Sequence, residues 1–173
     1  MNTGFERDEK GVRLRLATDE AAVVRTLVEQ LLTLLGERPD REGGLAALGI
    51  SERAEAPDDP VLARLFPDAY RGDDEAAGDF RRYTEAGLRD RKQHEAAVVL
   101  DGLRAGEVTL DDEAAQAWLR VLNDVRLALG TRLDITEDFY DRMAGLDVND
   151  PRYPMFAVYD WLTFLQESLV RAL

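Results

Sequence analysis

The stretch Asp111–Leu133, DDEAAQAWLRVLNDVRLALGTRL, decides the fold that this sequence predicts. Its apolar residues recur at three- and four-residue spacing and fill an arc of roughly 120° on a helical wheel, which predicts a helix with one face in a core. These apolar residues are Ala114, Trp118, Val121, Leu122, Val125, Leu129 and Leu133. Arg120, Asp124 and Thr131 fall opposite this arc, and we expect them to face water.

Arg126 does not follow this division of the core helix. It falls at the border of the apolar arc, and Asn123 and Gly130 follow on the same flank. A guanidinium in that position must find a carboxylate or carbonyl oxygens, because a buried unpaired charge is costly. We expect Arg126 to pair with Asp68 or Asp160, and a pair with Asp68 would pin its loop to the core helix.

We call the polar residues expected beside this helix the polar seam. They come from the core helix, from the segment RLFPDAY at 64–70 and from the last helix: Arg64, Asp68, Tyr70, Asn123, Arg126 and Asp160. One interpretation of the seam is an ion pair that holds the fold together. The alternative is a site for a small ligand.

Composition sets limits on the class of protein. With 173 residues, 45% hydrophobic and 33% charged, the chain predicts one globular domain, 1–173. Its net charge of −13 repels phosphate backbones and anionic lipid heads, so we expect a basic protein partner rather than nucleic acid or a membrane surface. The absence of cysteine excludes disulfides and thiolate chemistry. No apolar run of about 18 residues and no signal-peptide pattern occur, so we expect a cytoplasmic location without a membrane span.

Sequence patterns along the chain predict four regions. The alternation of Val12, Leu14 and Leu16 predicts a β-hairpin at 5–16, with Gly11 in its turn. A helix at 18–36, a flexible loop at 37–59 and a helical bundle at 60–173 follow. Val108–Leu110 is expected to be extended and either to join the hairpin or to lead into the core helix. The fold class is therefore mainly α: a bundle of about five helices with a small N-terminal β-hairpin packed on it.

Two helices of the bundle carry further expectations. In the long helix that starts at Asp73 or Asp74, apolar and aromatic residues are the expected core contacts: Phe80, Tyr83, Leu88, Val98, Val99 and Leu103. Its charged middle, Arg89–Glu95, predicts a solvated face. The last helix, Met155–Leu173, is apolar on most sides, so we expect it either at the centre of the bundle or in contact with a second chain in a homodimer.

Candidate chemistry is sparse. His94 and Asp90 could share a helix face, but no thiolate or second imidazole exists to complete a metal site. The acidic residues 111–113 stand at a helix start, where carboxylates serve as caps. No phosphate-binding glycine loop and no Gly-x-Ser-x-Gly motif occur. We therefore predict no catalytic residues, no cofactor and no metal.

Residues 109–143 also allow an interpretation as a DNA-binding helix-turn-helix motif. The second helix of that motif, EDFYDRMA at 137–144, is short and acidic, so it would suit the major groove of DNA poorly.

Four stretches together resemble a known family. They are FERDEKGVRLRL at 5–16, DPVLARLFPDAYRGD at 59–73, AWLRVLNDVRLALGTRLDIT at 117–136 and YDWLTFLQESLVRAL at 159–173. The chain resembles the actinobacterial domain-of-unknown-function family that includes the mycobacterial oxidative-stress transcriptional regulator AosR. The resemblance implies a cytoplasmic protein that acts on gene expression under oxidative stress through a sigma factor. That regulator is described as sensing redox state through cysteines. This chain has no cysteine, so the resemblance does not imply thiol sensing for it.

Three classes of function follow from these observations. The first is a non-enzymatic regulatory or adaptor protein that binds a protein partner such as a sigma factor. The second is a direct DNA-binding regulator, which would need a basic stripe; only Arg81-Arg82 and Arg89–Lys92 are dense enough in basic residues to supply one. The third is an enzyme or small-ligand-binding protein with a deep pocket at the polar seam.

Overall fold

A computed structural model of the chain describes residues 3–36, 55–104 and 107–173. Most of the predicted loop at 37–59 lies outside the described residues. The mainly α fold class is confirmed by the order of elements along the chain: β1 (Gly4–Asp8), β2 (Gly11–Arg15), α1 (Thr18–Leu35), α2 (Pro60–Leu65), α3 (Asp74–Arg104), β3 (Val108–Leu110), α4 (Asp112–Arg132), α5 (Phe139–Ala144) and α6 (Tyr153–Ala172).

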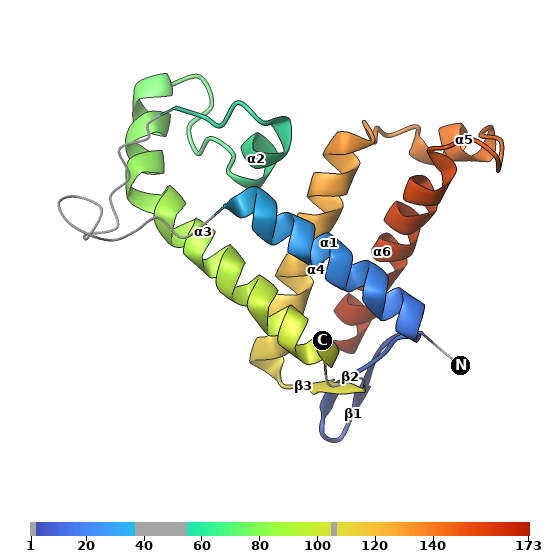
Figure 1. Cartoon of the computed structure of the whole chain (residues 1–173). Helices are drawn as coiled ribbons and strands as arrows, with labels where there is room; N and C mark the ends of the chain where they lie inside the picture. Colours follow the sequence, from blue (N-terminus) through green and yellow to red (C-terminus); the bar gives the residue numbers. More distant parts are fainter. Residues whose placement is uncertain (1–2, 37–54, 105–106) are drawn as a thin grey trace.

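Helix α4 stands at the centre of the fold, as the stretch 111–133 predicts. It contacts α1, α2, α3 and α6 as well as strands β2 and β3. In Figure 1, α1 crosses in front of α4, and α3 and α6 run on either side of it. Trp118 is fully buried at the core and meets Phe5 of β1 edge to face, with 5.7 Å between the ring centroids.

The buried arc of α4 is wider than the pattern predicts, because α4 has neighbours on several sides. Ala115 and Ala117 are also buried, whereas the predicted core residues Ala114 and Leu133 are half-buried. Asp124 is only 4% exposed, so the expectation that it meets water was wrong.

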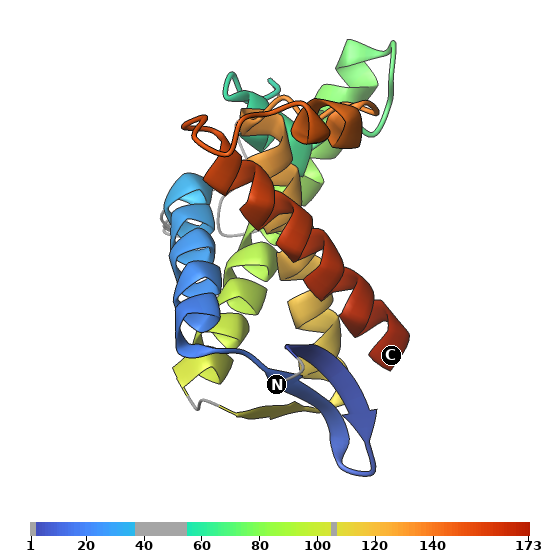
Figure 2. The same cartoon turned by 90° about the vertical axis from the view of Figure 1, so that its right-hand side faces the viewer.

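The strands form an antiparallel sheet in the order β1-β2-β3, which closes one end of the bundle (Figure 2). Phe5 pairs with Leu14, and Val12 pairs with Leu110, so the expected extended segment Val108–Leu110 joins the hairpin. Phe5, Val12 and Leu14 are buried, and the Phe5 N–H donates to the Ser168 hydroxyl at 3.1 Å. The packing of an N-terminal β-hairpin on helices is thereby confirmed.

The side of α3 that faces the core differs from the prediction. Val99 and Leu103 are buried, but Phe80 and Tyr83 are 45% and 66% exposed because they lie on the opposite side of the helix. Arg81, Glu85 and Glu95 are buried instead. The predicted solvated face at 89–95 was therefore wrong for Arg89, Lys92 and Glu95, although His94 is exposed.

Helix α6 packs on α4 and β1 through its buried apolar residues and lies at the side of the bundle, not at its centre. Phe164 and Val170 are 46% and 57% exposed on its other faces. Among the described residues, no helix is long and apolar enough to cross a membrane.

Two glycines give a matched test of this fold. Gly11 has φ +136°, and a Cβ on it would lie 2.4 Å from the Leu110 carbonyl oxygen. We predict that Gly11→Ala lowers the free energy of unfolding by about 3 kcal/mol, because it strains the backbone and separates β2 from β3. Gly87 is exposed in α3, and a Cβ on it would meet no atom within 4 Å. Gly87→Ala should raise the free energy of unfolding by about 0.5–1 kcal/mol.

Urea unfolding followed by circular dichroism measures both variants. Equal and small effects at the two positions would contradict the close approach of β2 and β3 at Gly11.

Candidate functional site

Arg126 of α4 is held by neutral side chains of α6. Its Nε donates to the Thr163 hydroxyl at 3.1 Å, its Nη1 to the Gln166 amide oxygen at 2.7 Å and its Nη2 to the Tyr159 hydroxyl at 3.5 Å. The guanidinium also lies over the Tyr159 ring, 5.3 Å from its centroid. The predicted pairing of Arg126 with Asp68 or Asp160 was therefore wrong: a hydroxyl–amide–phenol set on the neighbouring helix satisfies the group instead.

The two aspartates have other partners. Asp68 follows α2 and accepts a hydrogen bond from Arg81 of α3 at 2.5 Å. Asp160 of α6 lies beside Tyr140. Desolvation and the negative charge of Asp160, which accepts the phenol hydrogen bond, raise the pKa of Tyr140 above its usual value. Tyr70 packs edge to face on Phe80 and is 51% exposed.

The structure brings two of the six seam residues together. Arg64, at the end of α2, and Arg126 line one hollow of about 260 Å³, together with Tyr159, Thr131 and Asp134. Asn123 is half-buried one turn before Arg126 and is not part of the lining. Asp68, Tyr70 and Asp160 also lie outside that lining, so the seam does not form one site.

A second polar feature, which the sequence interpretation missed, runs along the inner side of α3. We call Arg81, Glu85, Arg89, Lys92 and Glu95 the α3 charge row. Their side chains are between 4% and 14% exposed, and each forms an ion pair. The row faces α1, α2 and α4, so it touches the three helices that surround α3.

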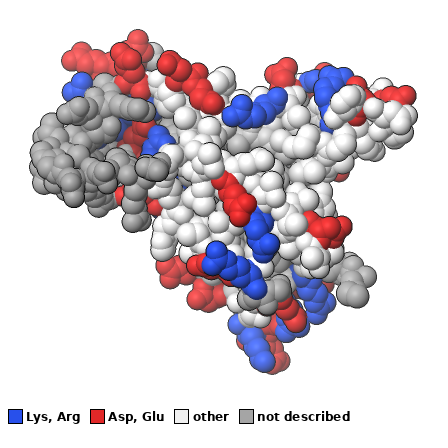
Figure 3. Space-filling view, in the orientation of Figure 1, with Lys and Arg blue, Asp and Glu red and all other residues white. Residues whose placement is uncertain are grey.

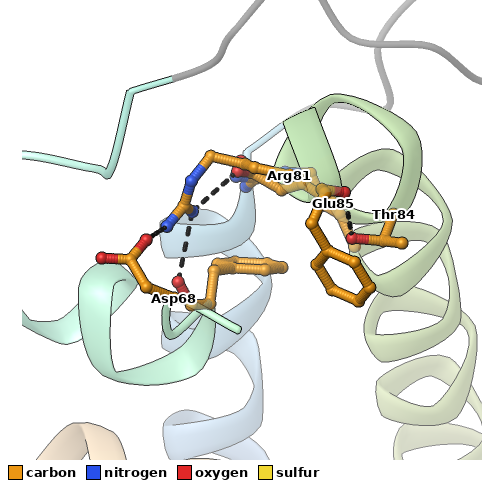
Figure 4. A network of polar contacts seen from close by, with 7 residues as sticks. Asp68, Arg81, Thr84 and Glu85 are labelled. Carbon is orange, nitrogen blue, oxygen red and sulfur yellow. Dashed lines mark hydrogen bonds and ion pairs between the residues drawn. The ribbon is translucent and has the colours of Figure 1, made fainter. Parts of the chain in front are cut away.

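Glu85 is the bridge at one end of this row (Figure 4). Its two carboxylate oxygens accept from Arg81 Nη1 at 3.0 Å and from Arg89 Nη2 at 3.1 Å. Arg81 also donates to the Phe66 carbonyl at 3.2 Å, and Arg89 donates to the Leu35 carbonyl. The last carbonyls of α1 and α2, which no longer have helical partners, are thus bound by cations from α3.

Opposing effects act on the pKa of Arg81. Burial lowers this pKa, but the hydrogen bonds from Arg81 to Glu85 and Asp68 and the charges of both carboxylates raise it, and the net shift is upward. Arg81 is therefore a permanent cation inside the fold, and its role is to hold Glu85 and Asp68 in place.

The other end of the row reaches α4. Lys92 Nζ donates to both carboxylate oxygens of Asp124 at 2.7 and 2.8 Å, and Arg120 Nε donates to Glu95 at 2.7 Å. Burial raises the pKa of Asp124, and the hydrogen bond and charge of Lys92 oppose this shift without cancelling it. Because the folded-state pKa of Asp124 is raised, its contribution to stability is greatest below its unfolded pKa and is lost as pH rises through its folded pKa.

A signal for the α3 charge row is present in the sequence. Arg81, Glu85, Arg89 and Lys92 recur at four-, four- and three-residue spacing, and the buried Ala96, Val99 and Leu103 continue the same helical face. Charges of both signs at the spacing of a core face therefore indicate a paired and buried row.

The outer surface near the start of α3 is acidic. A hollow of about 420 Å³ is lined by carboxylates with one arginine among them: Glu55, Asp68, Asp74, Glu75, Asp79 and Arg82. Figure 3 shows acidic side chains gathered over this end of the molecule. The exposed rings of Tyr70, Phe80 and Tyr83 belong to the same end of α3 and the segment before it.

In the described part of the chain, no group of three or more histidine or carboxylate residues could hold a metal ion. The polar residues of the two regions form hydrogen bonds and ion pairs. The two regions present charge to a binding partner. The surface around the start of α3 carries negative charge, and the hollow at Arg64 and Arg126 carries positive charge.

These features define a mainly helical domain with a paired ionic interior. The chain belongs to the family described as "Domain of unknown function (DUF2017)", whose model matches residues 2–173.

Named relatives come from mycobacteria. The "Oxidative stress regulator AosR" of Mycobacterium tuberculosis strain H37Rv and that of Mycobacterium bovis are each 36% identical to this chain over 186 residues, which covers 96% of this chain and 84% of the relative. The "Putative oxidative stress regulator AosR" of Mycobacterium leprae is 37% identical over 185 residues, covering 94% and 83%. These names support a regulatory role in oxidative stress and do not describe enzymes. No solved structure gives a significant match.

A double-mutant cycle tests the interior ion pair. We predict that Lys92→Met and Asp124→Leu each lower the free energy of unfolding by about 3 kcal/mol, because each leaves one buried charge without its partner. The double variant should recover most of this loss, since it removes both charges and fills the space with apolar atoms. Denaturant unfolding at neutral pH measures all four proteins. Additive losses in the double variant would mean that the two groups do not interact.

Proposed function

We propose that this chain is a non-enzymatic regulator of the oxidative stress response that works by binding another protein, a component of the transcription machinery such as a sigma factor. The observation that carries the proposal is its similarity, over 96% of its length, to relatives named as oxidative stress regulators. A cytoplasmic location follows from that role.

The distribution of charge supports a protein partner. The chain has a net charge of −13, and the hollow at the start of α3 combines five carboxylates with one arginine. Exposed aromatic rings at the same end of the helix, Tyr70, Phe80 and Tyr83, can bury apolar area in an interface. A partner that fits this surface is basic and offers Lys or Arg side chains to carboxylates and ring faces.

The α3 charge row argues against direct binding of DNA. That mode would need the basic residues of Arg81-Arg82 and Arg89–Lys92 on the surface. Arg81, Arg89 and Lys92 are instead turned inward and paired with Glu85 and Asp124, so they cannot neutralise phosphates.

A homodimer through α6 is a further proposal. Phe164 and Val170 remain exposed on the faces of α6 that do not pack on α4 or β1, and a second copy could cover them.

Charge reversal tests the partner proposal. We predict that the full chain binds a sigma factor of its own organism in a salt-dependent manner, and that Glu75→Lys with Asp79→Lys weakens the complex by about tenfold or more. The control pair, Glu29→Lys with Glu113→Lys, makes the same change in net charge at exposed positions on α1 and α4 and should weaken binding by less than about threefold. Both pairs include one acid from the first turn of a helix.

Biolayer interferometry with purified sigma factors at low and high salt measures these affinities. Affinity that does not change with salt, or equal effects of the two charge reversals, would contradict docking at the start of α3. Tighter binding to promoter DNA than to any sigma factor would favour the DNA-binding alternative.

A further inference from the structure

The hollow at Arg64 and Arg126 carries an inference that goes beyond the proposed function. It has a volume of about 260 Å³ and is formed where the ends of α2 and α4 meet α6. Two arginines line it, whereas the protein as a whole has 35 acidic and 22 basic residues. The polar side chains around it also include Thr131, Asp134 and Tyr159.

Arg126 is fixed in place without being neutralised. Thr163, Gln166 and Tyr159 accept three of its hydrogen bonds, and all three are uncharged. The Tyr159 ring restrains the plane of the guanidinium from one side. Such a group loses little conformational entropy when it binds an anion, because its position is already set, and its full positive charge is still available.

Donors remain for a ligand in this hollow. A guanidinium has five N–H groups. Arg126 uses three of them in its hydrogen bonds to α6, so two N–H groups remain for a ligand. Arg64 is exposed at the end of α2 and also lines the hollow. The Tyr159 hydroxyl accepts from Arg126 and can donate its own hydrogen. Together these groups can serve the several oxygens of one oxyanion.

The lining carries both signs of charge. Asp134 and the C-terminal end of α4 oppose the two arginines and leave a small positive excess. Two guanidinium groups and a hydroxyl offer more hydrogen-bond donors than a carboxylate with two oxygens can use, so they suit an oxyanion with several oxygens. Phosphate is the common dianion whose oxygens match the forked geometry of arginine.

We propose that this hollow is a binding site for the phosphate group of a small molecule, held between Arg64 and Arg126 with help from the Tyr159 hydroxyl. The group is either free phosphate or a phosphate ester, since both present the same oxygens. Occupancy would fix α2, α4 and α6 relative to one another and so give a regulator an input that needs no cysteine.

Calorimetric titration of the full chain tests the proposal, with orthophosphate, glycerol 3-phosphate and acetate as probes at ionic strength matched with sodium chloride. We predict one site with a dissociation constant of about 1 mM or lower for at least one phosphate probe. Acetate should bind at least about tenfold more weakly, because it carries one charge. The phosphate probe that binds more tightly identifies the source as free phosphate or an ester.

Variants assign the site. Arg64→Gln and Arg126→Gln should each weaken phosphate binding by about tenfold or more, and Tyr159→Phe by a smaller factor. Arg64 has an exposed side chain at the end of a helix, so Arg64→Gln should leave the fold intact even if Arg126→Gln does not. Arg171→Gln is the matched control. Arg171 is exposed, pairs with Glu167 and lies twelve residues beyond Tyr159 on α6, roughly 18 Å away.

The expected result is loss of binding in both pocket variants and an effect of less than about twofold in Arg171→Gln. No saturable binding of either phosphate probe, acetate binding of equal strength, or unchanged binding in a folded Arg64→Gln would overturn the proposal. None of these outcomes depends on whether a sigma factor binds at the start of α3.

Discussion

The fold depends on one buried carboxylate, Glu85, which binds two arginines of its own helix. Arg81 and Arg89 would be costly charges inside this bundle if Glu85 did not lie between them, because a buried unpaired charge costs several kcal/mol. Once paired, the two arginines reach outward to the Phe66 and Leu35 carbonyls and so close the ends of α2 and α1. One ionic cluster thus positions three helices, and the remaining members of the α3 charge row add the fourth, α4.

This arrangement decides which charges are available for function. Three basic residues of α3, Arg81, Arg89 and Lys92, are used inside the fold, while carboxylates of the same helix and the segment before it remain outside around a hollow of about 420 Å³. The proposed docking of a basic protein partner, rather than DNA, rests on this surface. The hollow at Arg64 and Arg126 has the opposite character, because Arg126 is held by neutral groups and keeps its charge. The two surfaces therefore favour different ligands.

Much of the fold could be predicted from periodicity alone. The apolar arc of 111–133 identified the central helix, and the alternation around Val12 and Leu14 identified the hairpin, because both patterns report which side chains must leave water. The partners of charged residues could not be predicted in this way. Arg126 was expected to pair with Asp68 or Asp160, yet three neutral groups on α6 satisfy it. The spacing of residues along one helix does not show which side chains a neighbouring helix brings into contact with it. A search for apolar periodicity also does not detect charged residues that are buried as ion pairs.

The most direct test of the central ionic cluster is the free energy of unfolding of Glu85→Gln, which keeps the shape of the side chain and removes its charge. Because two arginines would lose their shared counter-ion, we expect a loss of about 3 kcal/mol in urea unfolding at neutral pH, with Glu29→Gln on the exposed side of α1 as a control close to wild type. A Glu85→Gln variant within about 0.5 kcal/mol of wild type would contradict the account.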